Sequence, residues 1–188
     1  MPESERLPEP WNSFLRSLDA TVTESVAFHC IGGFVVTRRY GFQRETADLD
    51  VLSITPMQQT EGLLRAGAKG SGLHRQYKVY LDVVSAIQYY PEDYDHRLTE
   101  MFPGQLKNIR LLAPDPHDLA LMKLDRNIER DRDDVKYLAG EGLIQPDELK
   151  LRYETEMRPY VARPQDRLDR NLDLWLEMIR EQGARKRK

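Results

Sequence analysis

Two aspartates with one residue between them, Asp48 and Asp50, are the side chains in this sequence best placed to do chemistry. They lie at the start of an apolar segment that predicts a strand over 49–54, and side chains on a strand alternate between its two faces. Both carboxylates therefore project from one face, while Leu49 and Val51 face the core. Two carboxylates this close repel each other unless a cation lies between them, and hard oxygen ligands suit Mg²⁺. The spacing predicts a site for Mg²⁺ or Mn²⁺.

A third carboxylate and a pair of glycines extend this candidate site. Asp82 lies on a strand predicted over 77–84, and a neighbouring strand would bring it to the same metal. Gly32-Gly33 directly follows a strand predicted over 26–31 and precedes a short predicted helix. The missing Cβ atoms let phosphate approach the backbone, and a helix N-terminus supplies N–H donors. Metals held this way neutralise a nucleotide's phosphates and activate an attacking hydroxyl.

Each short motif also has a bland interpretation. An isolated Asp-x-Asp pair matches many sequences by chance, with Asp48 ending a loop, Asp50 solvated and Gly32-Gly33 forming a simple turn. The order of the elements is more specific than any one piece, because a strand, Gly-Gly, a short helix and a second strand with Asp-x-Asp occur together. This order favours the metal and phosphate site.

Lys123 and Asp134, eleven residues apart, are the candidate pair in the second half of the chain. A helix is predicted from 115 or 117 to 139, with a break near Asn127, and eleven residues are close to three helical turns. The two side chains would share one face of an unbroken helix. One interpretation is a phosphate-binding cation with a carboxylate that positions it. The other is an exposed row of salt bridges on a solvated helix face.

Basic side chains flank the carboxylate and glycine motifs. Arg44 and Thr46 come just before the Asp-x-Asp pair, and a guanidinium matches phosphate oxygens bidentately. Arg38 and Arg39 follow Gly-Gly and diverge around a helix, so at most one of them faces a ligand. A further run without acidic residues predicts either a clamp for a nucleic-acid backbone or a solvated glycine-rich loop. Its cations are Arg65, Lys69, Arg75 and Lys78.

These motifs together resemble a known family, the minimal nucleotidyltransferases of the DNA polymerase β superfamily, and especially the branch similar to abortive-infection (AbiEii-type) toxins. The resemblance covers residues 31–138. The motifs that carry it are Gly32-Gly33, a gap of fourteen residues, Asp48-Leu49-Asp50 with the preceding Arg44-x-Thr46, the lysine-bearing segment Asp118–Leu124 and the charged segment Arg130–Asp134.

The resemblance implies a metal-dependent transfer of NMP from an NTP to an acceptor hydroxyl. In the family the Asp-x-Asp pair binds metal, the glycine motif holds the triphosphate and the lysine contacts phosphate. Gly33 stands where many members carry Ser, so backbone N–H donors replace a hydroxyl. The implied catalytic residues are Asp48, Asp50 and Lys123, the metal ligands Asp48, Asp50 and Asp82, and the nucleotide-binding residues Gly32, Gly33, Arg44, Thr46, Lys123 and Asp134.

The toxin-like branch also implies partners. It favours RNA, in particular tRNA, as the acceptor, ahead of a protein or a small molecule such as an aminoglycoside, and it implies a cognate antitoxin protein. A non-catalytic nucleotide-binding module is the alternative from a different class of function.

The elements that must position these residues predict an α+β fold with a mixed sheet, because strands dominate the first part and helices the second. Besides the strands above, a strand is predicted over 109–112 and a loop over 67–74. Helices are predicted from Trp11, after Gly-Gly, and over 58–65, 145–157 and 165–182. The expected division is a flexible segment 1–10, a nucleotidyltransferase-like core 11–114, a helical part 115–182 packed on the core and a basic tail 183–188.

Composition restricts the class of protein further. The 188 residues carry 31 acidic and 28 basic side chains, so the net charge of −3 excludes a surface that is cationic throughout. Any contact with a polyanion must therefore be local. The single cysteine, Cys30, has no partner within the chain, which is typical of a reducing cytoplasm. No apolar run approaches the ~20 residues that span a bilayer, so we expect no membrane association.

Overall fold

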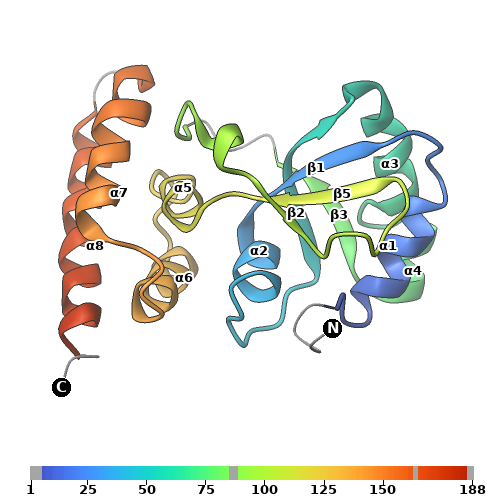
Figure 1. Ribbon diagram of the computed structural model, residues 1–188, viewed down its shortest axis with the longest axis horizontal. Helices are drawn as coiled ribbons and strands as arrows, with labels where there is room; N and C mark the ends of the chain where they lie inside the picture. The colour runs from blue at the N-terminus through green and yellow to red at the C-terminus, as the bar shows by residue number, and fades with distance from the viewer. Residues whose placement is uncertain (1–5, 85–88, 163–164, 186–188) are drawn as a thin grey trace. The chain divides into compact units, whose positions relative to one another are not determined.

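Two compact units make up the described part of the chain (Figure 1). One unit holds the described residues up to 84 together with Leu98–Ala113, and the other holds 89–97 and the described residues from Pro114 onward. A five-stranded mixed sheet lies in the first unit and helices dominate the second, which confirms the predicted α+β class. The computed structural model describes residues 6–84, 89–162 and 165–185.

The sheet of the first unit has the strand order β3-β2-β1-β5-β4. The central strand, β1, is antiparallel to β2 on one side and parallel to β5 on the other. Strand β2 is parallel to β3, and β4 is antiparallel to β5. The strands are β1 (Val26–Cys30), β2 (Asp48–Thr55), β3 (Tyr80–Val83), β4 (Thr99–Met101) and β5 (Ile109–Ala113).

A bulge divides β2 into two parts. The Cα partners change from His29 with Ser53 to Cys30 with Val51, so that Leu52 is an extra residue on β2. Burial alternates strictly only before the bulge, along the stretch that contains both aspartates. Bulges are over-represented beside active sites, where they change the direction in which side chains point.

The described part of the first unit contains four α-helices. The predicted apolar stripe of the first helix is confirmed, because Trp11, Phe14, Leu15 and Leu18 are all fully buried. Figure 1 shows α1 lying beside α3 and α4, against which it packs. Each such buried side chain contributes about 1.5–3 kcal/mol of hydrophobic stabilisation. The helices are α1 (Trp11–Asp19), α2 (Gly32–Arg38), α3 (Thr60–Gly67), which follows the 3₁₀ turn η2 (Met57–Gln59), and α4 (Gly72–Tyr77).

Helices also form the second unit. The stripe predicted on the last helix is buried, which includes Leu168, Leu172 and Trp175. A π-helical turn, η4 (Tyr153–Met157), directly continues helix α7 (Pro146–Arg152). The α-helices are α5 (Pro116–Leu121), α6 (Glu129–Gly140), α7 (Pro146–Arg152) and α8 (Asp166–Arg185), with 3₁₀ turns η3 (Tyr94–Arg97) and η5 (Arg158–Tyr160).

The predicted break near Asn127 separates α5 from α6. Asn127 has a φ of +44°, a backbone conformation that asparagine tolerates better than most residues. Its side-chain amide donates to Asn171 (2.9 Å) and accepts from the indole N–H of Trp175 (2.9 Å). The break is therefore fixed by hydrogen bonds to α8.

Three segments differ from the sequence-based prediction or add to it. Helix α4 occupies part of the loop predicted over 67–74, because Ser71 caps the helix by accepting from the backbone N–H of His74 (3.1 Å). This helix delays the start of β3 to Tyr80, and the short strand β4 was not predicted at all. Within the described residues no helix is long and apolar enough to cross a membrane.

The two ends of the chain lie partly outside the described residues. In the segment predicted to be flexible, 1–10, the described residue Leu7 is buried and its N–H donates to the side chain of Gln105 (2.9 Å). Helix α8 continues into the segment 183–188, of which the last three residues are not described.

Candidate functional site

Asp48 and Asp50 occupy the first and third positions of β2 and project from the same face of the strand. Both side chains are half-buried, whereas Leu49 and Val51, which point to the other face, are fully buried. Burial of Leu49 and Val51 in the hydrophobic core thus fixes which face of the strand points inward. Both carboxylates lie together on the opposite face.

Thr46 contacts the first of these carboxylates. Its hydroxyl donates to Asp48 Oδ1 at 2.6 Å, a length typical of a strong bond to a charged acceptor. The backbone between them is attached to the sheet, because the carbonyl of Ala47 accepts from the N–H of Tyr80 (2.9 Å). The hydroxyl is therefore held in place by β3 as well as by β2.

Gly32 lies against the second carboxylate. It has a φ of +69°, which L side chains rarely adopt, and a Cβ at this position would overlap Asp50 Oδ2. The backbones are joined as well, since the N–H of Ile31 donates to the carbonyl of Asp50 (2.9 Å). Glycine is required here on two grounds, and α2 begins at this point with N–H groups that lack intrahelical partners. Gly33, the next residue, is buried.

Asp82 lies on the neighbouring strand, opposite Asp50. The two residues are Cα partners in the parallel pair β2–β3, so their side chains share a face of the sheet, and Asp82 is exposed. No three His, Cys, Asp or Glu side chains among the described residues gather into a metal-binding group. The two carboxylates of β2 would therefore be the donor set for a divalent ion, and their oxygens fit a hard cation such as Mg²⁺.

The arginines near this site differ in their surroundings. Arg44 is half-buried, with its guanidinium 5.4 Å from the centre of the Phe42 ring. At the end of α2, Arg39 is exposed, whereas Arg38 Nε is buried and has no hydrogen-bond partner among the described residues. Burial lowers the pKa of Arg38 below its ordinary value. A buried donor of this kind fits an anionic ligand. The sequence predicted that at most one of Arg38 and Arg39 faces a ligand, but it did not indicate which of them is buried.

The cations predicted as a clamp or a solvated loop lie on α3, α4 and the turns beside them. Arg65 forms an exposed pair with Glu61 (2.7 Å), and Arg75 donates to the carbonyl of Gly70 (2.5 Å). Lys69 lies 5.6 Å from the centre of the Tyr80 ring. Tyr80 is the Cα partner of Asp48, so this basic segment belongs to the same edge of the sheet as the carboxylates.

Lys123 and Asp134 lie in the second unit and contact each other there. Lys123 Nζ is 3.0 Å from Asp134 and 3.7 Å from Asp131, and the lysine side chain is only 6% exposed. Burial alone would raise the pKa of Asp131, but hydrogen bonds from Arg126 and the charge of Lys123 lower it. The sequence predicted that Lys123 and Asp134 share one face of an unbroken helix, but the helix is broken: α5 ends at Leu121, Asp134 lies on α6, and the two side chains meet across the break. The pair is buried, however, and so is not the exposed row of salt bridges that was the alternative.

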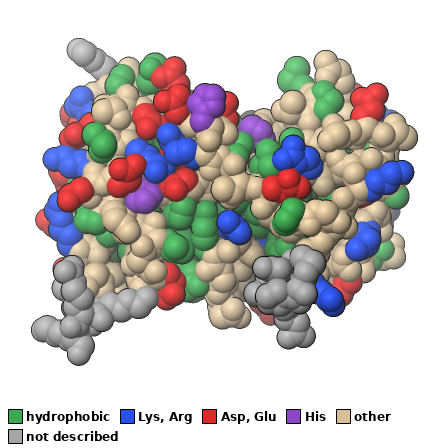
Figure 2. All heavy atoms as spheres, in the orientation of Figure 1, with side chains coloured by type: hydrophobic (Ala, Val, Ile, Leu, Met, Phe, Trp, Pro, Cys, Tyr) green, Lys and Arg blue, Asp and Glu red, His purple; other side chains and the backbone are tan. Residues whose placement is uncertain are grey.

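A larger ion network in the second unit had no signal in the sequence. The fully buried Asp118 accepts a bidentate pair of bonds from Arg97 (2.7 and 2.9 Å) and a third from Arg152 (3.0 Å). Arg97 also binds Glu156, and Arg152 binds Asp115. The partners lie 21 to 59 residues apart, a separation that no helical or strand period connects. Figure 2 shows acidic and basic side chains interspersed over this unit as well.

His117 completes the network through both ring nitrogens. The backbone N–H of Gln145 donates to Nε2 (3.0 Å), so Nδ1 carries the proton of the neutral ring and donates to Asp115 (2.8 Å). Burial alone would raise the pKa of Asp115, but the bonds from His117 and the charge of Arg152 lower it to about 2. The surroundings of Asp115 therefore keep this carboxylate ionised to a lower pH than an ordinary aspartate.

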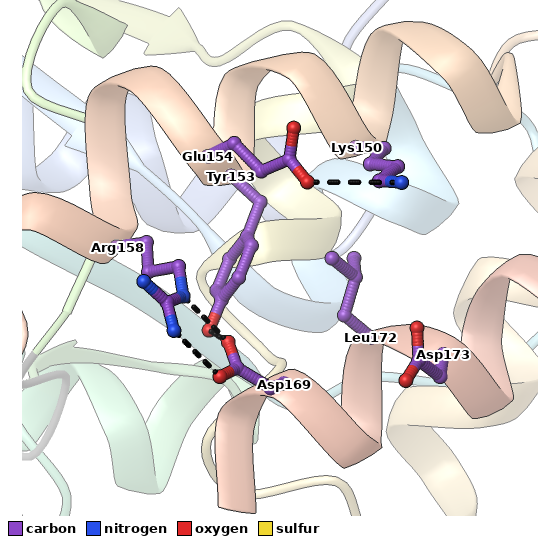
Figure 3. A pocket seen from close by; sticks show the side chains of 7 residues that line it. All are labelled: Lys150, Tyr153, Glu154, Arg158, Asp169, Leu172 and Asp173. Atoms are coloured by element: carbon purple, nitrogen blue, oxygen red, sulfur yellow. Dashed lines mark hydrogen bonds and ion pairs between the residues drawn. The ribbon is translucent and has the colours of Figure 1, made fainter. Parts of the chain in front are cut away.

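A cavity of about 400 Å³ in the second unit has a mostly charged lining (Figure 3). The Tyr153 hydroxyl donates to Asp169 (2.6 Å), and Arg158 donates to both oxygens of the same carboxylate (2.9 and 3.0 Å). Burial and this bond raise the pKa of Tyr153. The cations and carboxylates of the lining largely compensate one another, and no ligand class stands out.

Comparison with known proteins gives one match. A family model described as "Nucleotidyltransferase of unknown function (DUF6036)" matches residues 13–182, which is most of the chain. The match therefore includes the glycine pair, the aspartates of β2 and the buried lysine. The searches of curated proteins and of solved structures found no match.

Proposed function

We propose, from the premise that the chain belongs to this family of nucleotidyltransferases, that it transfers NMP from an NTP to an acceptor hydroxyl with the help of Mg²⁺ or Mn²⁺. The acceptor oxygen forms a bond to the α-phosphorus, the bond from that phosphorus to the β-phosphate oxygen breaks, and pyrophosphate leaves. The acceptor proton is released to solvent. The observation that carries this proposal is the pair of carboxylates on one face of β2, one of them lying against a glycine whose φ of +69° L side chains rarely adopt.

Each residue of the first unit has a defined part in this proposal. Asp48 and Asp50 would hold the divalent ion, which neutralises phosphate charge and lowers the pKa of the attacking hydroxyl. Gly32 and Gly33 keep the backbone open to the triphosphate and offer the N–H groups at the start of α2. Asp82 lies on the same face, on the neighbouring strand, but outside this pair of ligands.

The buried lysine and the arginine before the aspartates retain the roles that the family resemblance implies. Arg44 is a phosphate contact in this proposal, and so is Lys123, whose ammonium Asp134 holds in place. The ion pair explains how the lysine keeps one position, because two buried carboxylates compensate its charge.

RNA, in particular tRNA, is the acceptor that we favour, in a toxin-like role in the cytoplasm with a cognate antitoxin. The support is local: the edge of the sheet that carries Asp48 also carries Lys69 and the basic residues of α4. A protein or a small molecule such as an aminoglycoside is the second acceptor class. The experiments below distinguish it from RNA by which molecule becomes labelled.

Four NTPs labelled at the α-phosphate, each incubated with total RNA and with total protein, test the reaction itself. We expect Mg²⁺-dependent labelling of one acceptor class with release of pyrophosphate, and loss of both in Asp48→Asn and Asp50→Asn. Glu45→Gln is the matched control, because Glu45 is exposed in the segment just before β2. Nucleotide binding without any turnover would show a non-catalytic module instead.

The choice of RNA is tested through the dependence of binding on salt. Arg75→Ala with Lys78→Ala removes two exposed cations of the basic segment. If both contact phosphate, the slope of log affinity against log salt becomes shallower by about one unit per contact, while NTP binding is unchanged. Labelling of protein or of a small molecule, with no salt-dependent RNA binding by the wild type, would replace RNA by the second class.

A further inference from the structure

The hydroxyl of Thr46 has one hydrogen, and that hydrogen is directed at a carboxylate. The bond to Asp48 Oδ1 is 2.6 Å long, whereas the distance to the backbone carbonyl of Asp48 is 3.4 Å. An ionised carboxylate only accepts, so threonine is the donor. A hydroxyl that donates here has no second hydrogen to offer to a phosphate. The nucleotide contact that the family resemblance implies for Thr46 is therefore not the role that the geometry favours.

The backbone makes this donor rigid. Thr46 lies two residues before Asp48, and its hydroxyl reaches that carboxylate, so both side chains lie on the same side of the backbone. Ala47 between them is hydrogen-bonded to β3 through Tyr80. Threonine is β-branched, so its side chain has few rotamers to choose from. The oxygen of Asp48 thus meets a donor whose position is set by two strands.

The two aspartates of β2 have different surroundings. The carboxylate of Asp50 fills the space that a side chain at position 32 would take, so Gly32 leaves room for it. Asp48 instead accepts a hydrogen bond from the Thr46 hydroxyl. A ligand carboxylate needs a fixed orientation, and residues behind such ligands typically change metal affinity by 10–100-fold when they are lost.

We infer that Thr46 is a positioning residue: its hydroxyl holds one oxygen of Asp48 so that this carboxylate presents itself to the divalent ion in a single orientation. The inference rests on the proposed function, because it assigns Asp48 to the metal. It predicts that loss of the hydroxyl weakens metal binding more than nucleotide binding.

Thr46→Val removes the hydroxyl and keeps the shape, and Thr46→Ser keeps the hydroxyl. Thr55→Val is the control, because it is the same change at the exposed end of β2. The first readout is binding of Mn²⁺ alone, followed by the electron paramagnetic resonance signal of the unbound ion. We expect the dissociation constant of Thr46→Val to rise about tenfold. Thr46→Ser and Thr55→Val should resemble the wild type.

The second readout is steady-state kinetics. Thr46→Val should need more Mg²⁺ for half-maximal velocity, while the KM for NTP at saturating Mg²⁺ stays unchanged. Unaltered Mn²⁺ binding in Thr46→Val, or equal defects in the Val and Ser variants, would overturn the positioning role. So would a raised KM for NTP with normal Mn²⁺ binding, which would make Thr46 a nucleotide ligand.

Asp48→Asn separates this inference from the proposed function. If the wild type binds Mn²⁺ and Asp48→Asn does not, the metal site is established and Thr46→Val alone decides the positioning role. If the wild type binds Mn²⁺ no better than Asp48→Asn, the metal assignment fails and the positioning role is overturned with it.

Discussion

Asp48 in the first unit and Asp118 in the second show two ways in which this protein accommodates a carboxylate. Asp118 is fully buried and two arginines neutralise it. Asp48 is half-buried, accepts a hydroxyl bond and forms no ion pair with any described residue. Removal of one partner from the buried network would leave an uncompensated charge, whereas the charge of Asp48 has no protein cation beside it and is open to a cation from solution. The difference separates the scaffold from the candidate centre without reference to sequence motifs.

The largest expected effect comes from removing the charge of the aspartates on β2. Asp48→Asn or Asp50→Asn should lower NMP transfer at least 10³-fold, equivalent to about 4 kcal/mol in the transition state, because an amide is a poor ligand for Mg²⁺. The melting temperature should change by only a few degrees, as both side chains are half-buried. The labelling assay measures the NMP transfer, and thermal denaturation followed by circular dichroism measures the melting temperature. A variant that unfolds but keeps its activity per folded molecule would reverse the comparison.

Asp118→Asn should show the opposite behaviour. The change leaves Arg97 and Arg152 facing a neutral amide in a buried site, and breaking a buried pair typically costs about 3 kcal/mol. For a chain of this length that corresponds to a fall of roughly 6–12 °C in the melting temperature. Asp133→Asn, which alters an exposed pair with Lys136, is the control and should change stability by less than about 0.5 kcal/mol. Equal melting curves for the two variants would contradict the buried network.

Lys123→Met sharpens the comparison, because the lysine is paired as in the scaffold but is implied to be functional. We expect a loss of about 2 kcal/mol in the free energy of unfolding, since Asp134 and Asp131 lose a buried cation while Arg126 still binds Asp131. Adding Asp134→Asn should recover part of that loss. The KM for NTP, measured on the folded fraction, should rise as well. A normal KM would make Lys123 a purely structural residue.

The smallest expected effect is the dependence of stability on pH. The pKa of Asp115 is about 2 in the folded protein against an ordinary 3.8, so the stabilisation is complete above the ordinary pKa. It is lost as the pH falls from about 4 towards 2, and the side chain's partial exposure limits it to about 1–2 kcal/mol. Urea denaturation at pH 5 and pH 3 measures the change. Asp115→Asn should lose less stability over this interval than the wild type, and an identical pH dependence would contradict the assignment.

Local patterns predicted the elements that carry the candidate centre. The alternation around Leu49 predicted which face holds the aspartates, and Gly-Gly predicted the start of α2. Helix α4 was not expected, because the glycines around it are typical of a turn. The only local signal for a helix was its N-cap, Ser71, and a single serine is weak evidence. The network around Asp118 was also not predicted, because its bonds join segments far apart in the chain and depend on the fold that they stabilise.

The second unit is discontinuous, and this affects how the protein is made. Arg97 belongs to it but is followed by the last two strands of the first unit, and its partner Glu156 is synthesised 59 residues later. At about 5–20 residues per second, a ribosome takes roughly 3–12 seconds to supply that partner. The sheet of the first unit is complete in sequence at Ala113, before the α-helices of the second unit have been translated. The nascent chain must therefore keep the segment that ends at Arg97 available until α7 and η4 have been translated.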